Sequence, residues 1–305
     1  MEVSVVVCTY SMERLDAFYE AVDSILEQTY EPIEIVLVID GNERVFERVR
    51  DRYGDHENVV LHCNDENQGI SYSRTKGGEI ASGDVVAFID DDATAHPTWI
   101  EELVDVYDET DALAVGGRMA PDWVAGRPKF LPEEFYWLIG VTHRGFAEPG
   151  EEVRNTFGSN LSFKREVFLD LGGFDPNVGR KGEKEMQAHE SEIGARLRRQ
   201  YNQGVIYHPD AIVEHKVFDY RTQLTWLLNR AFMQGYSKRV LAKLAPDASG
   251  DKNEFLSQLL LEFVPDRLRK LVRNPSVEQA SQLLMLFLLT GTVGLGYLYG
   301  IATVR

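Results

Sequence analysis

Apolar and polar residues are arranged in two kinds of pattern along the first 90 residues of the chain. Short β-branched runs predict buried strands, and the stretches between them carry apolar residues at helical spacing, which predicts helices. The expected strands are residues 2–10, 34–40, 58–63 and 84–89, and the expected helices are 12–28, 43–53 and 70–82. This alternation is typical of an α/β domain with a mainly parallel sheet and helices on its faces.

The pattern is looser in the second part of the chain. A helix over 100–109 and a strand over 112–119 precede an aromatic-rich segment with proline and glycine, 121–150, which we interpret as a long loop or lid. Residues 220–244 have the spacing of an amphipathic helix, which either lies in a membrane interface or packs on the domain. Between these segments we expect a strand and a helix within 158–175, a helix over 189–200 and a pair of strands within 205–217.

The last apolar stretch is long enough to cross a membrane. Residues 279–304 contain no charged side chain, and a helix of this length spans a hydrocarbon core of about 30 Å. Four basic residues precede it: Arg267, Arg269, Lys270 and Arg273. By the positive-inside rule they keep the bulk of the chain in the cytoplasm. The sequence therefore predicts a single-pass membrane protein, and the alternative is a buried terminal helix.

Composition narrows the choice of partners. The 305 residues carry a formal net charge of −17, and the pI is about 4.9. Phosphate-backbone binding needs a basic surface, so nucleic acid is excluded as the main partner. Only 10 of the 32 basic residues are lysines, a composition that resembles salt-adapted cytoplasmic proteins; the alternative is an ordinary acidic protein. Cys8 and Cys63 lie in apolar runs and are expected to be buried thiols.

Polar residues follow the ends of several predicted strands. Ligands of α/β sheets bind at the carboxyl ends of strands, and there the sequence places Thr9, Tyr10, Asp40, residues 64–69 and the triplet Asp90–Asp92. Alternate side chains of an extended chain point the same way, so the outer two carboxylates of the triplet converge. Clustered carboxylates suit a hard divalent cation such as Mg²⁺ or Mn²⁺. A cation that bridges to a diphosphate would offset their mutual repulsion.

Five motifs in this order and spacing resemble the family 2 glycosyltransferases of the GT-A fold. The opening strand of the family resembles VSVVVCTY (3–10), and its second nucleotide-contacting strand resembles VLVIDG (36–41). Its N-x-G-x-x-x-x-R-N pattern is similar to NQGISYSRTKG (67–77), and its D-x-D segment is similar to FIDDDA (88–93). The stretch beneath its acceptor site resembles GSNLSFKREVFLDLGGFDPNVG (158–179). Thr75 departs from the third pattern, where asparagine is usual.

The resemblance implies an inverting transferase with a Rossmann-like GT-A domain, a nucleotide-diphosphate sugar donor and Mg²⁺ or Mn²⁺ as cofactor. A uridine or guanosine donor is favoured, and UDP is our preference. The implied nucleotide-binding residues are Thr9, Tyr10, Asp40, Asn67, Arg74, Asp90 and Asp91. The implied metal ligands are Asp90, Asp92 and His215.

The helix HESEIGARLRRQ carries the expected catalytic base. An inverting transferase needs one carboxylate to take the proton of the acceptor hydroxyl. Aligning Glu192, Arg196 and Leu197 with the family's E-x-x-x-R-L pattern places Glu190 at the position of the base, with glutamate for the usual aspartate. Glu192 is the second choice, and both acids also suit a helix N-terminus without any catalytic role. His189 either orients Glu190 or has no role.

The apolar tail indicates an acceptor that is itself in a membrane, such as a dolichyl phosphate that carries a glycan. The composition and the tail together resemble haloarchaeal transferases that build lipid-linked glycans for N-glycosylation of proteins such as the S-layer glycoprotein, moving a hexuronic acid or a hexose. We expect a nucleotide-sugar-binding half over residues 1–115 and an acceptor-binding half with the base over 116–219. An amphipathic membrane-proximal region over 220–278 and a transmembrane helix over 279–304 follow.

Three other functions stay open at this point. The chain could serve another surface polysaccharide or glycolipid, although a processive synthase is disfavoured because the Q-x-x-R-W motif is missing. A nucleotidylyltransferase is disfavoured because TYSMERLDAF, after the first strand, has no glycine. A non-catalytic membrane scaffold with the same fold is the third. Sugar choice depends on loops 121–150 and 176–188, for which the sequence offers no template.

Overall fold

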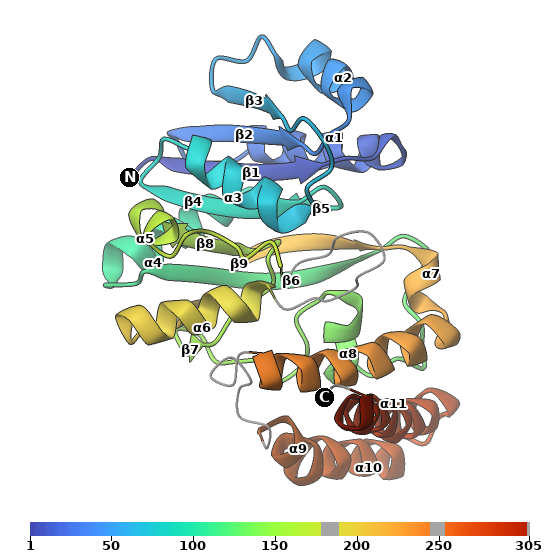
Figure 1. The fold of residues 1–305 in the computed structure, drawn as a ribbon. Coiled ribbons are helices and arrows are strands. Elements are labelled where there is room, and N and C mark those ends of the chain that lie inside the picture. Colours follow the sequence, from blue (N-terminus) through green and yellow to red (C-terminus); the bar gives the residue numbers. More distant parts are fainter. Residues whose placement is uncertain (178–188, 245–253, 304–305) are drawn as a thin grey trace. The chain divides into compact units, whose positions relative to one another are not determined.

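The computed structural model describes residues 1–177, 189–244 and 254–303 (Figure 1). Most of the 176–188 loop therefore lies outside the described residues. By internal contacts the chain forms two units. Unit 1 comprises residues 1–120 and 147–215, and unit 2 comprises 121–146 and 216–305. Residues 121–146, which the sequence analysis assigned to an acceptor half, thus group with the C-terminal helices.

The first part of unit 1 has the predicted alternation. Strands β1 (Val3–Thr9), β2 (Ile33–Ile39), β3 (Val59–Cys63) and β4 (Val85–Asp90) are parallel to their neighbours, in the order β3-β2-β1-β4. Between them lie the 3-10 turn η1 (Met12–Arg14) and helices α1 (Leu15–Leu26), α2 (Glu43–Tyr53) and α3 (Ile70–Ile80).

The rest of the sheet is antiparallel, so the sheet as a whole is mixed. It contains β5 (Ala93–Ala95), β6 (Ala114–Trp123), β7 (Glu152–Val153), β8 (Leu161–Lys164) and β9 (Val205–Val217). Strand β8 joins it to β4, and β9 pairs with both β5 and β7. A pair of strands was expected within 205–217, but β9 is one continuous strand. The proline at 209 lies inside this strand and does not end it. Helices α4 (Trp99–Glu109), α5 (Arg165–Asp170) and α6 (His189–Tyr201) complete this unit.

The pleat of the strands divides the core of unit 1 into two layers. Successive side chains point to opposite faces, so Val5 and Val7 pack with residues of α1, α2 and α4, while Val6 and Cys8 pack with residues of α5 and α6. Helix α3 also lies on the second face, where a Cβ on Gly77 would come within 2.3 Å of the side chain of Val6. Both faces are covered, which leaves the carboxyl ends of the strands as the place for polar groups.

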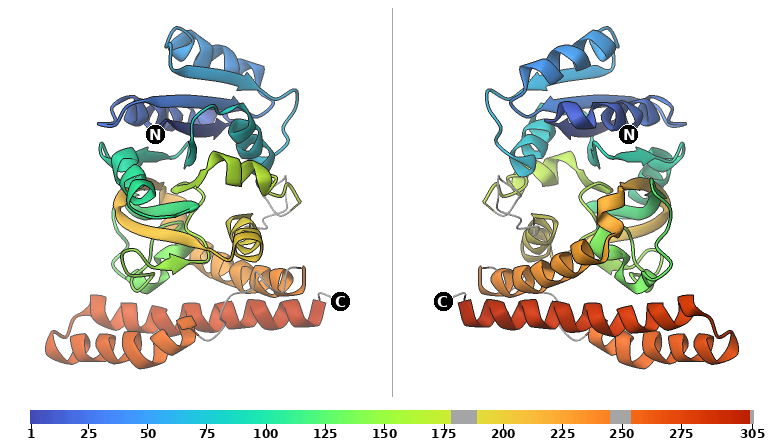
Figure 2. Two further views of the ribbon diagram at one scale, coloured as in Figure 1. Left: turned by 90° about the vertical axis from the view of Figure 1, so that its left-hand side faces the viewer. Right: turned by 90° about the vertical axis from the view of Figure 1, so that its right-hand side faces the viewer.

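Unit 2 is helical in its described part. The segment read as a loop contains the 3-10 helix η2 (Glu133–Ile139), whose aromatic residues join an apolar core. The C-terminal part forms α7 (Asp219–Thr222), α8 (Leu224–Leu244), α9 (Glu254–Gln258), the π-helical turn η4 (Leu259–Phe263), α10 (Val264–Arg273) and α11 (Val277–Thr303), which Figure 2 shows from two sides. Apolar and polar residues are segregated on α10 but not over the length of α8. The amphipathic character expected at 220–244 therefore lies further along the chain.

A buried ion pair lies inside unit 2. Glu134 has no exposed surface, Arg267 is 5% exposed, and Nη2 of Arg267 is 2.7 Å from Oε2 of Glu134. Gln282 of α11 also accepts from Arg267. Arg267, one of the four basic residues before the apolar segment, is thus buried and paired with Glu134.

Helix α11 is the one helix in the described ranges that is long and apolar enough to cross a membrane. One side of it packs along α8 through glycines: a Cβ on Gly296 would lie 1.9 Å from the carbonyl oxygen of Phe232, and a Cβ on Gly235 would lie 1.9 Å from that of Val293. On the other side large apolar side chains are exposed: Leu284, Phe287, Leu288, Leu295, Leu298 and Ile301.

These glycines predict opposite effects for one substitution at two sites of the same helix. Gly296→Ala is expected to lower the melting temperature, because forcing a methyl group between two backbones costs about 1–3 kcal/mol. Gly291→Ala meets nothing within 4 Å and should raise stability, since alanine favours a helix over glycine by about 1 kcal/mol. Thermal unfolding of both variants in detergent measures this. Equal effects would contradict the close contact of α8 and α11.

Candidate active site

The parallel strands bring the predicted polar residues to one end of the sheet. Cys8 of β1 pairs with Asp90 of β4, and Thr9 pairs with Ile39, so the residues that follow these strands are neighbours. The hydroxyl of Thr9 donates to Oδ2 of Asp91 at 2.8 Å, and the backbone N–H of Asp40 donates to the carbonyl oxygen of Thr9. Tyr10 is 54% exposed beside them.

Arginines face the carboxylate triplet. Arg74 of α3 is buried and donates through Nη2 to Oδ1 of Asp90. Nη1 of Arg14 lies 2.9 Å from Oδ1 of Asp91 and 3.2 Å from Oδ2 of Asp92. Burial raises the pKa of Asp91 to about 6, although Arg14 opposes the rise. Arg14 is not among the residues predicted from the sequence, because its spacing is that of any surface residue at the start of a helix.

His215 reaches the triplet through the antiparallel part of the sheet. Ala93 of β5 pairs with His215 of β9, which places Nε2 of the imidazole 3.3 Å from Oδ1 of Asp92. Two ligands of one cation are separated by about this distance, since metal–ligand bonds for Mg²⁺ are 2.0–2.1 Å long. The carboxylate of Asp90 is the least buried of the three and is engaged by Arg74. The structure thus brings His215 to Asp92, while no contact among the described residues joins the carboxylate of Asp90 to either of them. A divalent cation held by Asp90, Asp92 and His215 stays a prediction.

The carboxylate of Asp40 organises the loop after β3. Oδ1 accepts from Nδ2 of Asn64 at 2.8 Å and from the backbone N–H of Gln68 at 2.9 Å, while Oδ2 accepts from the N–H of Gly69 at 2.8 Å. Asn67 lies in this loop with an exposed side chain. In this structure Asp40 therefore shapes the loop, and its contact with a base stays a prediction.

Asp40→Asn is expected to weaken donor binding about tenfold or more. An amide turns one acceptor oxygen into an NH₂ group, which faces a backbone N–H and leaves it unsatisfied at a cost of about 1–3 kcal/mol. The loop should then open, with faster hydrogen exchange over residues 65–70 and a higher Kd for UDP in titration calorimetry. Asp65→Asn is the matched control in the same loop, because its side chain is exposed. Unchanged exchange in Asp40→Asn would contradict this role.

Glu190 lies in the first turn of α6, beside the same network. Its Oε1 is 3.0 Å from Nε2 of His189 and accepts from the backbone N–H of Gly158 at 3.1 Å. Burial alone would raise the pKa of Glu190, but His189 and Arg74 more than offset it and hold the pKa well below its usual range. Glu192, the second choice for the base, is engaged by Arg196, whose Nε is 2.7 Å from Oε1.

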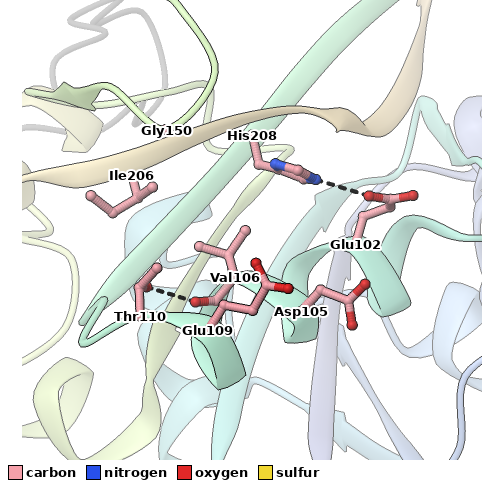
Figure 3. Close-up of a pocket in the computed structure, with 8 residues that line it drawn as sticks. All are labelled: Glu102, Asp105, Val106, Glu109, Thr110, Gly150, Ile206 and His208. Atoms are coloured by element: carbon pink, nitrogen blue, oxygen red, sulfur yellow. Dashed lines mark hydrogen bonds and ion pairs between the residues drawn. The ribbon is translucent and has the colours of Figure 1, made fainter.

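A separate pocket in unit 1 contains none of the predicted site residues. It is lined by residues of α4 and β9, among them Glu102 and His208, whose ion pair is drawn in Figure 3. Glu102, His208 and Asp210 bring potential metal-ligand atoms within 4.8 Å of one another. Glu102 and His208 are partly exposed and already contact one another, and Asp210 is exposed, so the cluster does not by itself indicate a ligand.

Comparison with known proteins bears on the whole chain. The model of glycosyl transferase family 2 matches residues 4–172. A glucosyl-dolichyl phosphate glucuronosyltransferase of Haloferax volcanii is 60% identical over 304 residues, which cover 99% of this chain and 97% of that protein. A pre-mycofactocin glycosyltransferase of Mycobacterium tuberculosis is 26% identical over 70% of this chain and 43% of its own length.

Solved structures share the fold. A mannosyltransferase of Pyrobaculum calidifontis in complex with GDP-Man and Mn²⁺ has a TM-score of 0.58 at 18% identity, over 97% of this chain and 87% of its own. S. aureus TarS 1–349 in complex with UDP-GlcNAc has a TM-score of 0.54 at 15% identity, over 96% and 82%. The family model spans more than half of this chain and the haloarchaeal relative aligns with nearly all of it, so the chain belongs to glycosyl transferase family 2 and is a glycosyltransferase with the GT-A fold.

Proposed function

We propose that this enzyme transfers a hexuronic acid, glucuronic acid, from a UDP-linked donor to a glucosylated dolichyl phosphate, as a step in building a lipid-linked glycan for protein N-glycosylation. The observation that carries the proposal is the identity of 60% over 304 residues to the Haloferax volcanii enzyme of that name. The alignment covers 97% of that relative, so the similarity is not limited to the nucleotide-sugar-binding part.

We assign the donor to the carboxyl ends of β1, β2 and β4. In this assignment Tyr10, Asn67 and the loop held by Asp40 contact the nucleoside. Arg74 and Arg14 carry the positive charge that a diphosphate requires. One guanidinium group can bind two phosphate oxygens at once through two parallel N–H···O hydrogen bonds.

A divalent cation belongs to this site, held by Asp90, Asp92 and His215. When bound, it would neutralise the diphosphate and act as a Lewis acid for its departure. The hydroxyl of Thr9 donates to Asp91, the middle carboxylate of the triplet. We therefore assign Asp91 to the nucleotide site as a carboxylate that supports the turn and contributes negative charge.

The base is Glu190, which takes the proton of the acceptor hydroxyl as that oxygen attacks the anomeric carbon. Attack from the face opposite the leaving diphosphate inverts the configuration, so an α-linked donor gives a β-linked product. The low pKa of Glu190 keeps the carboxylate ionised at neutral pH, so the proton-accepting form is always present.

The acceptor lipid places the enzyme at the cell membrane. Helix α11 is 27 residues long, and only 28% of its most apolar window is buried. We assign it as the single transmembrane span, with the catalytic domain in the cytoplasm, where nucleotide sugars are made. The functional ranges 1–115, 116–219, 220–278 and 279–304 stay a prediction.

A donor and acceptor panel tests the proposal. The full chain in detergent at high salt is incubated with Mn²⁺, a glucosylated dolichyl phosphate and either UDP-glucuronic acid, UDP-glucose or GDP-mannose. We expect UDP release and a lipid product heavier by one hexuronic acid with the first donor alone, and neither after chelation of the metal. Mass spectrometry of the lipid and NMR of the new linkage measure both. Transfer of a neutral hexose would contradict the sugar assignment.

A further inference from the structure

The imidazole of His189 lies between a cation and a carboxylate. Its Nε2 atom is 2.9 Å from Nη1 of Arg74 and 3.0 Å from Oε1 of Glu190. The ring of Phe174 meets it edge to face, with centroids 5.8 Å apart and planes at 87°. The guanidinium of Arg74 lies over the same aromatic ring. One phenyl group therefore fixes the orientation of both side chains.

The two contacts of Nε2 require opposite protonation. Arg74 can only donate a hydrogen bond and an ionised Glu190 can only accept one, so a single ring nitrogen satisfies one of them at a time. Arg74 has another acceptor in Asp90, whereas a bare Nε2 would turn its lone pair toward the carboxylate of Glu190. The proton therefore belongs on Nε2, donated to Glu190.

Nδ1 of His189 offers no alternative position for this proton. It is buried and has no hydrogen-bond partner in the part of the chain that the structure describes. A buried N–H without an acceptor is unfavourable. The geometry thus favours a proton on Nε2.

Two donors from other residues bind the same oxygen of Glu190. Oε1 accepts from Nε2 of His189 and from the N–H of Gly158, and the backbone N–H of Glu190 itself adds a hydrogen bond to the carboxylate. A Cβ at position 158 would lie 2.7 Å from Oε1 and 2.4 Å from Nη1 of Arg74, so glycine is needed there for the backbone to approach.

We propose that His189 is a positioning residue, which anchors Oε1 of Glu190 through its Nε2–H and so leaves Oε2 to take the proton of the acceptor hydroxyl. This inference rests on the proposed function of Glu190 as the base. It assigns a role to the histidine that stands where the family usually has an acidic residue.

Loss of this donor has a predictable effect on pH dependence. His189 and Arg74 together hold the pKa of Glu190 down against the effect of burial. The charged groups around the ring are Arg74 of α3 and Glu190 of α6, with Asp90 of β4 behind Arg74. Removing the imidazole takes away one hydrogen bond to the carboxylate of Glu190, so its pKa should rise. Because the base works only when ionised, activity should then fall at acidic pH.

Two substitutions separate this role from a structural one. His189→Leu fills the space without a donor and should lower kcat about 10–100-fold, with KM for the donor unchanged within about twofold. The acid limb of kcat/KM should move up by about one pH unit or more. His189→Gln places an amide N–H near the position of Nε2–H and should recover most of kcat and the wild-type acid limb. His208→Gln, which removes the imidazole paired with Glu102 (Figure 3), is the matched control and should change neither.

A spectroscopic measurement tests the inference without turnover. In ¹⁵N-histidine-labelled full-length enzyme, the resonance missing from His189→Gln identifies the ring, and its nitrogen shifts report the tautomer. We expect the Nε2–H tautomer. An Nδ1–H tautomer, or Leu and Gln variants with equal kcat and equal acid limbs, would overturn the role of His189. Absence of glucuronosyl transfer by wild-type enzyme would instead overturn the proposed function, and the tautomer would still be readable.

Discussion

Glu190→Gln is expected to lower the rate of sugar transfer by about 10²–10⁴-fold, the usual worth of a positioned general base. Glutamine preserves the shape of the side chain and its oxygen can still accept from Gly158 and His189, so the fold and donor binding should be unchanged. Initial rates of transfer together with calorimetry of UDP and Mn²⁺ binding measure the two effects separately.

Glu192→Gln is the matched control two residues away on α6. Its carboxylate pairs with Arg196, which in turn donates to the carbonyl oxygen of Gly173 at 2.8 Å. The substitution should lower the melting temperature modestly and leave kcat within about threefold of the wild type, as expected for a partly exposed ion pair. A large loss of kcat in Glu192→Gln with a mild one in Glu190→Gln would reverse the assignment of the base.

Asp92→Asn is expected to abolish metal-dependent donor binding and to lower transfer by ~10²–10³-fold, the effect of losing one electrostatic stabiliser of a transition state. Asp92 is 2% exposed and meets both His215 and Arg14. An amide keeps the volume but removes the charge that a cation needs. Mn²⁺ titration followed by electron paramagnetic resonance, in the presence of UDP, measures the loss directly.

Asp55→Asn serves as the control for this change, because Asp55 is an exposed carboxylate in the turn after α2. It should bind Mn²⁺ and UDP as the wild type does. Wild-type metal affinity in Asp92→Asn together with lost affinity in Asp90→Asn would contradict this assignment. The cation would then be held by Asp90 and not by Asp92 and His215.

The sequence predicted the parallel half of the sheet well, because each of its strands contains an apolar run, and β1, most of β2 and β4 are buried on both faces. Asp40, Arg74 and the carboxylate triplet follow those runs, so strand order alone brings them together. The residues 121–150 were harder to read. Their aromatic residues form a 3-10 helix with a core of its own, and 3-10 spacing has no strong periodic signature.

Two contacts of the site have no local signal in the sequence. Arg14 reaches the triplet from the first turn after β1, across more than 70 intervening residues. Gly158 approaches Glu190 by its backbone, and a backbone donor leaves no trace in residue type beyond the glycine itself. Such contacts depend on how distant segments pack, which pattern and spacing along one chain do not encode.

The close approach of α8 and α11 at Gly235 and Gly296 makes that contact independent of the solvent. A seam formed by large apolar side chains weakens when lipid replaces water, because hydrocarbon competes for the same surface. Here backbone meets backbone, and van der Waals contact of this kind drives helix association inside bilayers as well. The two helices can therefore keep one geometry on both sides of the water–lipid boundary, so membrane attachment would need no refolding of the pair.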